Sequence, residues 1–229
     1  MAAGALLAVA ATANWLYQVA RKPAELFFPV SGVLWKAPAQ TWEAYGPIFR
    51  RHATATITPE LLAALAQVEG SGNPVARTYW RWRLTHEPFE IYRPASSAVG
   101  MYQITDGAFR EARRYCIRNN EVVEDGQWND WQSCWFNSLY FRVIPSHAVE
   151  LTSAFLDRRV ASIAPKASAA QKQDLAAVIH LCGAAAGAAF AARGFRVPAG
   201  QRCGDHDLRA YLARLNAMKR AFARLAALG

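Results

Sequence analysis

The sequence predicts a mainly α-helical protein: one compact helical domain with a small irregular or β lobe. Apolar residues recur at helical spacing in several stretches, most clearly over 208–225, where arginines occupy the opposite face. Alanine is dense over 171–192, a composition that favours helices and lets them pack closely. Aromatic and basic residues alternate over 78–83, which predicts a short extended segment. With 229 residues, 53% of them hydrophobic, the chain is long enough for one domain with a full core.

The N-terminus has features of an export signal. Ala5 to Ala11 is an apolar run, and Ala11-Thr12-Ala13 is a pattern that a signal peptidase cuts, here before Asn14. A positively charged start is missing, and the apolar run is short for a membrane span. We therefore expect residues 1–13 to be a signal peptide or an uncleaved anchor, and the protein to be exported to the periplasm or cell envelope.

Residues 14–56 are expected to form a lead-in that packs on the domain. Prolines and aromatic residues are mixed up to Pro38, which predicts irregular or partly helical structure. Thr41 is then expected to cap a helix over 42–52, which Gly46-Pro47 would bend or break.

The next predicted helix ends in a glutamate, Glu69. Thr58 is a suitable N-cap, Pro59 suits the first helical position, and Gly70 suits the end. The buried stripe of this helix is Leu61, Leu65 and Val68. An apolar surrounding and the negative end of the helix dipole both disfavour a charged carboxylate. We therefore expect Glu69 to hold a proton near neutral pH, as a general acid must; the alternative is a surface glutamate whose carboxylate reaches water.

A second motif follows, and the pair resembles a known family. The helix ending Glu69-Gly-Ser-Gly-Asn-Pro, followed by Gly100-Met101-Tyr102-Gln103, resembles the soluble lytic transglycosylases, relatives of goose-type lysozymes. The resemblance implies a lysozyme-like fold over residues 57–229 with Glu69 as the catalytic residue. It implies that Gly100, Met101, Tyr102 and Gln103 line the glycan cleft. Ser71, one position later than the family's serine, would orient the glutamate or the substrate.

The chain departs from the family at two places. The spacer between Glu69 and Gly100 is longer, and the later Ala-Tyr-Asn motif has only residues 179–183, Ile-His-Leu-Cys-Gly, as its counterpart. His180 is therefore expected in the cleft in place of the family tyrosine, or else as an interior histidine. Tyr211 is expected to bond Glu69 or a sugar, or else to be a core residue of the last helix.

The resemblance implies that the spacer, residues 73–97, forms the small lobe over the cleft. Its alternation puts Trp80 and Trp82 on one side, and Tyr79, Arg81 and Arg83 on the other. Trp80 or Trp82 would be a platform for a sugar ring, and Arg81 or Arg83 would reach a peptide carboxylate. Alternatively, the two tryptophans would close a small core with Phe89, Ile91 and Tyr92.

The remaining chain is expected to be helical apart from a polar loop over 119–129. Thr105 or Asp106 would cap a helix that runs to about Arg118. Helices are also expected over 145–164, from Gln171 onward, with residues 184–192 either continuing that helix or starting another, and from about 208 to Ala227. A further helix face is expected from Trp128, Trp131, Trp135 and Phe136.

Four cysteines fit an exported protein with two disulfides, for which three pairings exist. We predict the local pairs Cys116–Cys134 and Cys182–Cys203, each adding on the order of 3 kcal/mol of stability. The competing interpretation is a metal site of Cys182, Cys203 and His206, helped by Asp205 or Asp207, but the short paired spacing of zinc sites is missing. We expect neither a metal nor a cofactor.

The net charge of +9 favours anionic partners. Arginines are spread along the helices without a nucleic-acid motif, so we expect no nucleic acid as partner. Peptidoglycan strands, whose stem peptides carry carboxylates, fit this charge.

The resemblance implies non-hydrolytic cleavage of the β-1,4 bond between N-acetylmuramic acid and N-acetylglucosamine. Glu69 would protonate the leaving oxygen and then take the proton of the muramyl C6 hydroxyl, giving a 1,6-anhydro sugar. One carboxylate suffices because the nucleophile belongs to the substrate. Two alternatives stay open: hydrolysis, with Asp106 or Glu90 holding a water, and a non-catalytic peptidoglycan-binding or assembly module of a secretion or conjugation apparatus.

Overall fold

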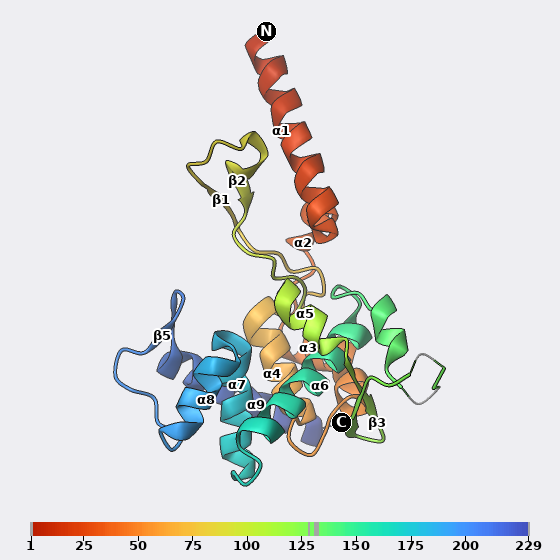
Figure 1. Ribbon diagram of the computed structural model, residues 1–229, viewed down its shortest axis with the longest axis vertical. Coiled ribbons are helices and arrows are strands. Elements are labelled where there is room, and N and C mark those ends of the chain that lie inside the picture. The colour runs from red at the N-terminus through yellow and green to blue at the C-terminus, as the bar shows by residue number, and fades with distance from the viewer. Residues whose placement is uncertain (1, 128, 131–132, 229) are drawn as a thin grey trace.

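The structure, a computed structural model, describes residues 2–127, 129–130 and 133–228 and confirms the mainly helical class, with 59% helix and 9% strand. A helical body carries two projections at one end, the helix α1 and a β-hairpin (Figure 1). The helices of the body are α3 (Pro38–Arg51), α4 (Pro59–Gly70), α5 (Asp106–Ala112), α6 (Pro145–Ile163), α7 (Ala169–Cys182), α8 (Ala184–Ala192) and α9 (Leu208–Leu228).

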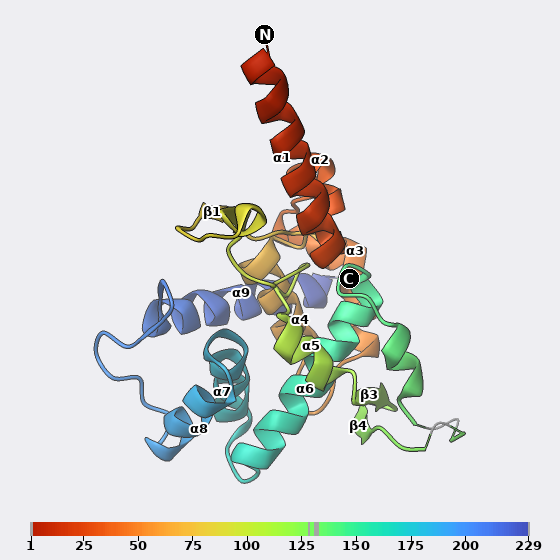
Figure 2. The same ribbon diagram turned by 45° about the horizontal axis from the view of Figure 1, so that its top comes forward.

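Helix α4 lies at the centre of the body. Thr58 caps it by accepting a hydrogen bond from the Leu61 N–H at 3.3 Å, as predicted. All residues from Leu61 to Ala66 are fully buried, because α4 packs against α3 and α9 (Figure 2). This burial holds the end of α4, and therefore Glu69, at a defined position.

The N-terminal segment is more helical than predicted. Helix α1 (Ala2–Arg21) continues through the expected cleavage site and ends before Pro23, the first proline. By length and composition α1 is able to cross a membrane, with a mean hydropathy of 1.2. A 3₁₀ turn, η1 (Pro23–Phe27), and the short α2 (Phe28–Ser31) lead from α1 to the body.

Helix α3 differs from its prediction in two ways. It begins at Pro38, where the Ala37 N–H donates to Gln40 Oε1 at 2.9 Å, so Thr41 does not cap it. Thr41 is buried instead and donates to Gln67 Oε1 of α4 at 2.7 Å. Pro47 does not break α3, because it lies on the exposed side of the helix, where water can satisfy the carbonyl that loses its partner.

The predicted extended segment forms a hairpin. Strand β1 (Trp80–Trp82) pairs antiparallel with β2 (Tyr92–Pro94), and the 3₁₀ turn η2 (Pro88–Glu90) lies between them. We use "β1–β2 hairpin" below for residues 77–96.

A second hairpin replaces the end of a predicted helix. Helix α5 stops at Ala112, and β3 (Tyr115–Arg118) pairs with β4 (Glu121–Glu124). The prediction of a helix to Arg118 was wrong because Asn119 and Asn120 both adopt positive φ, 51° and 63°, as a tight hairpin turn requires. A 3₁₀ turn, η3 (Trp135–Leu139), follows; Trp128 and Trp131 of the expected helix face lie outside the described residues.

Both predicted disulfides are present, Cys116–Cys134 and Cys182–Cys203. The first ties β3 to the segment before η3. The second ties the end of α7 to β5 (Arg202–Cys203), which pairs with β6 (His206–Asp207) just before α9. Both cysteine ligands of the competing metal site are therefore used in this disulfide.

Candidate functional site

Glu69 lies half-buried at the C-terminal end of α4. The chain turns sharply after it, since Ser71 and Gly72 adopt positive φ values of 49° and 64°. Tyr211 of α9, only 3% exposed, donates a hydrogen bond from its hydroxyl to Glu69 Oε1 at 2.7 Å. Burial, and then the charge of Glu69, raise the pKa of Tyr211 well above its usual value. Tyr211 therefore stays protonated and acts as a permanent donor to the carboxylate.

The two sequence motifs lie in direct contact. A Cβ atom on Gly70 would stand 2.8 Å from Met101 Cα and 2.9 Å from its carbonyl oxygen, so only glycine fits here. Gly100 has a φ of 80°, and a Cβ there would stand 2.4 Å from the Arg142 carbonyl oxygen. The close approach at Gly70 lets Met101 lie against the end of the Glu69 helix, and the one at Gly100 lets the same motif pack against the chain at Arg142.

Gln103 is the residue of its motif that reaches a cavity. Its Nε2 donates to the carbonyl oxygens of Gly100, at 2.8 Å, and Ala76, at 3.2 Å. Its Oε1 is thereby presented as an acceptor. Met101 and Tyr102 are fully buried, so in this structure they support the motif from the inside.

Glu69, Ser71 and Gln103 line one cavity of about 450 Å³. Its other walls come from the base of the β1–β2 hairpin, residues 77–79, and from the segment after α2. Trp35 and Tyr79 are both 68% exposed and border this cavity. Sequence reasoning missed both residues, although the alternation over 78–83 had placed Tyr79 on the side opposite the tryptophans.

The two predicted sugar platforms lie elsewhere. Trp80 lines a separate groove against α1 and donates from Nε1 to Glu25 Oε2 at 3.0 Å. Trp82 is 74% exposed and packs on Tyr92, with ring centroids 4.6 Å apart. The structure thus brings Tyr79, the residue just before β1, to the Glu69 cavity, and neither of the two tryptophans.

His180 lines a second cavity, of about 410 Å³, between α5, α6 and α7. Gln103 borders this cavity as well as the first, so the two adjoin at Gln103. The carboxylate of the second cavity, Glu111, is paired with Arg159 at 2.5 Å. His180 is half-buried at the wall of this second cavity and does not line the Glu69 cavity.

Neither alternative acid lies in the Glu69 cavity. Asp106 pairs with Arg142 at 2.7 Å, and Glu90 pairs with Arg21 and Arg93. Glu69 is the one carboxylate among the described residues that line its cavity. The site therefore offers one carboxyl group, a phenol that holds it, an amide acceptor and exposed aromatic faces, which together suit proton transfer to a polar, ring-shaped substrate. No protein-family model, curated protein or solved structure matches this chain.

Proposed function

We propose that this protein is a lytic transglycosylase with a lysozyme-like fold that cleaves peptidoglycan. One observation carries the proposal: the cavity that holds Glu69 is lined by no second carboxylate among the described residues. Hydrolysis of a glycosidic bond normally uses two carboxyl groups, one for the leaving oxygen and one for water or a covalent intermediate. Cleavage by a hydroxyl of the substrate itself needs only one.

In the proposed reaction, protonated Glu69 gives its proton to the oxygen that bridges muramic acid and glucosamine. The bond from that oxygen to muramyl C1 breaks, and the muramyl C6 hydroxyl attacks C1. Glu69 takes the hydroxyl proton and returns to its starting state, with a 1,6-anhydro ring as product. Tyr211 fixes the orientation of the carboxyl group throughout.

The other cavity residues have binding roles in this proposal. Gln103 Oε1 accepts a hydrogen bond from an N-acetyl N–H or a hydroxyl group. Trp35 and Tyr79 offer exposed rings on which the C–H faces of sugars stack. Ser71, which lines the cavity, bonds the substrate in this proposal.

The cell envelope is the proposed location. The apolar α1 fits a signal or an anchor, and the two disulfides fit an oxidising compartment. Local opening of the wall for a secretion or conjugation apparatus is a setting consistent with this location.

Mass spectrometry of the soluble products from purified sacculi tests the proposal, comparing the parent with Glu69→Gln. Glu43→Gln, on the exposed side of α3, is the matched control. We expect anhydromuropeptides from the parent and the control, and none from Glu69→Gln.

Two other results would contradict the proposal in different ways. Products with reducing muramic acid would mean hydrolysis on the same site. Folded protein that binds sacculi but releases nothing from either variant would mean that the cavity binds glycan without cleaving it.

A further inference from the structure

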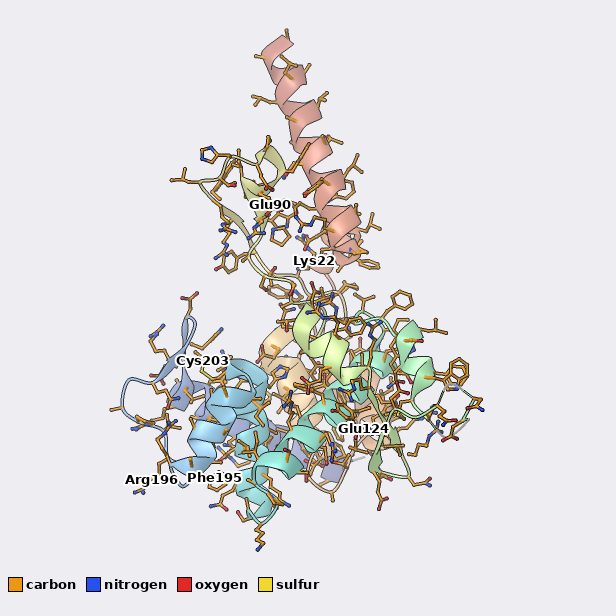
Figure 3. All side chains as sticks on the ribbon, viewed as in Figure 1. Lys22, Glu90, Glu124, Phe195, Arg196 and Cys203 are labelled. Carbon is orange, nitrogen blue, oxygen red and sulfur yellow. A yellow bond between two sulfur atoms is a disulfide. The ribbon has the colours of Figure 1, made fainter. Side chains whose placement is uncertain are left out.

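Helix α1 and the β1–β2 hairpin project from the same end of the body and are joined to each other. Asn14 Nδ2 donates to the Tyr92 carbonyl oxygen at 2.8 Å, and Gln18 Nε2 donates to that of Phe89 at 2.6 Å. Tyr17 stacks on Phe89 with ring centroids 5.0 Å apart. Glu90 of the hairpin faces α1, where Arg21 pairs with it (Figure 3). These contacts fix the hairpin beside the last turns of α1.

Both projections expose apolar surface. Residues 2–12 of α1 are exposed throughout and include no charged residue. At the tip of the hairpin, Trp82 is 74% exposed and Leu84 is completely exposed, at 107%. Exposed apolar patches of this kind mark a contact with another surface, because isolated soluble domains rarely leave them uncovered.

The flanking residues favour a lipid bilayer as that surface. Aromatic residues gather where the two projections meet: Trp15 and Tyr17 on α1, and Trp80 and Tyr92 on the hairpin. Such rings collect at the level of lipid headgroups, since they have an apolar body and a polar edge. Arg81 and Arg83 extend from the hairpin, both exposed, with no ion pair among the described residues. Arginines beside exposed apolar residues favour an anionic membrane over a neutral protein surface.

The groove between the projections supports the same assignment. It has a volume of about 340 Å³ and is lined by Ala11, Asn14 and Trp15 of α1 and by Trp80 and Tyr92. Trp15 Nε1 and Asn14 Oδ1 are buried without a hydrogen-bond partner within the described residues. Headgroups, which carry donors and acceptors, supply such partners at the membrane surface.

We propose that the β1–β2 hairpin is a membrane-contact element that acts together with α1. Residues 2–12 of α1 enter the bilayer; at 1.5 Å per residue they reach to a depth of roughly 16 Å, about half of the hydrocarbon core. Trp82 and Leu84 lie in the interfacial layer, and Arg81 and Arg83 bind lipid phosphates.

The proposal has a consequence for the candidate site, a step that rests on the proposed function. Tyr79 belongs to both the hairpin base and the Glu69 cavity. The chain from Tyr79 to Leu84 spans at most about 18 Å. The membrane contact therefore holds the cavity close to the bilayer, so that the glycan strands nearest to the membrane are its substrate.

The test uses the full chain with one fluorescent label that is sensitive to polarity. The described cysteines are all in disulfides, so an added cysteine is a unique attachment point. We would label Leu84→Cys at the hairpin tip and Leu6→Cys on α1. Leu139→Cys in η3, 63% exposed on the body, is the matched control. Each protein is mixed with vesicles of phosphatidylethanolamine and phosphatidylglycerol, with and without spin-labelled lipid.

We expect labels at positions 6 and 84 to shift to the blue and to be quenched by spin-labelled lipid, and the label at 139 to stay unchanged. Replacing both Arg81 and Arg83 with Gln should weaken binding to these vesicles about thirtyfold, from about fivefold per arginine. A response at 6 without one at 84 would overturn the proposal, because α1 alone would then contact the membrane. No response at either position would also overturn the proposal. So would a spectral shift at position 84 that appears without lipid and grows with protein concentration, because this would indicate contact with a second copy of the chain. None of these readouts depends on cleavage activity, so they are separate from the test of Glu69.

Discussion

Glu25 joins the N-terminal segment to the base of the β1–β2 hairpin. Replacing Glu25 is the sharpest test of what holds the hairpin to that segment. Its side chain is fully buried in η1 and forms an ion pair with Arg77. Trp80 Nε1 donates to the same carboxylate at 3.0 Å, and Lys22 Nζ lies 3.2 Å from Glu25 Oε1, outside hydrogen-bonding geometry. Burial lowers the pKa of Lys22, and the charge of Glu25 opposes this effect.

Glu25→Gln keeps the size of the side chain and removes its charge. Lys22 and Arg77 then remain as largely buried cations near each other without their shared counter-charge. Breaking a buried ion pair by removal of one partner costs about 3–5 kcal/mol. If this cost is borne by local opening of the hairpin, amide exchange there should accelerate roughly 140- to 3,700-fold, at tenfold per 1.4 kcal/mol.

Native-state hydrogen exchange measures this opening directly. The amides to follow are Ala95, which donates to the Tyr79 carbonyl oxygen at 2.8 Å, and Arg83, which donates to that of Ile91 at 2.7 Å. Glu121→Gln, at an exposed position of β4, is the control and should leave both amides unchanged. Exchange at Ala95 and Arg83 that is equal in the parent and in Glu25→Gln would refute the argument that Glu25 holds the hairpin.

Three further predictions concern the site and the fold. Tyr211→Phe keeps a buried ring but removes the hydrogen-bond donor to Glu69. We therefore expect kcat/KM on sacculi to fall about 10- to 100-fold, while binding to sacculi is retained. Unchanged kinetics would show that Tyr211 has no part in the mechanism. Gly100→Ala forces a Cβ to 2.4 Å from the Arg142 carbonyl oxygen at positive φ, so it should lower the free energy of unfolding, measured in urea, by about 3 kcal/mol or more. Gly107→Ala is the control, because Gly107 has open space around it, and it should not lower the free energy of unfolding. Equal effects of the two substitutions would contradict the close approach at Gly100. Burial lowers the pKa of His52, against the opposing charge of Glu150, and burial also lowers the pKa of His147. The unfolded chain therefore binds these protons more readily, and the free energy of unfolding should decrease as the pH falls below about 6.5. His52→Gln should flatten that slope, and greater stability at acidic pH would show that the sign is wrong.

Local sequence signals predicted the elements that use short-range chemistry. Thr58, Pro59 and the apolar stripe predicted α4 and the place of Glu69 at its end. The alternation over 78–83 predicted β1, and the spacing of the cysteines favoured the two disulfides that are present. The hairpin of β3 and β4 had a local signal as well, the pair Asn119-Asn120, whose preference for positive φ was overlooked.

The residues that come together at the site were harder to predict. Tyr211 bonds Glu69 across 142 residues of sequence, and no local pattern separates that role from an ordinary core tyrosine. The alternation of β1 defined its two faces but not which face meets the cavity. Nothing in the sequence around Trp35 indicated that it lies at the cavity wall.

The sequence by itself determined the helical class, the central helix and the position of Glu69, and it favoured the cysteine pairs, because each depends on neighbours along the chain. Only the tertiary structure decided that Tyr79 and Trp35 border the cavity and that Asp106 and Glu90 lie outside it. It also decided that the hairpin packs against α1 and η1, since the contacts that join them, Gln18 with Phe89 and Glu25 with Arg77, link segments that are distant in sequence. Packing selects among the faces that periodicity leaves equivalent, and that selection determines which side chains meet at the site.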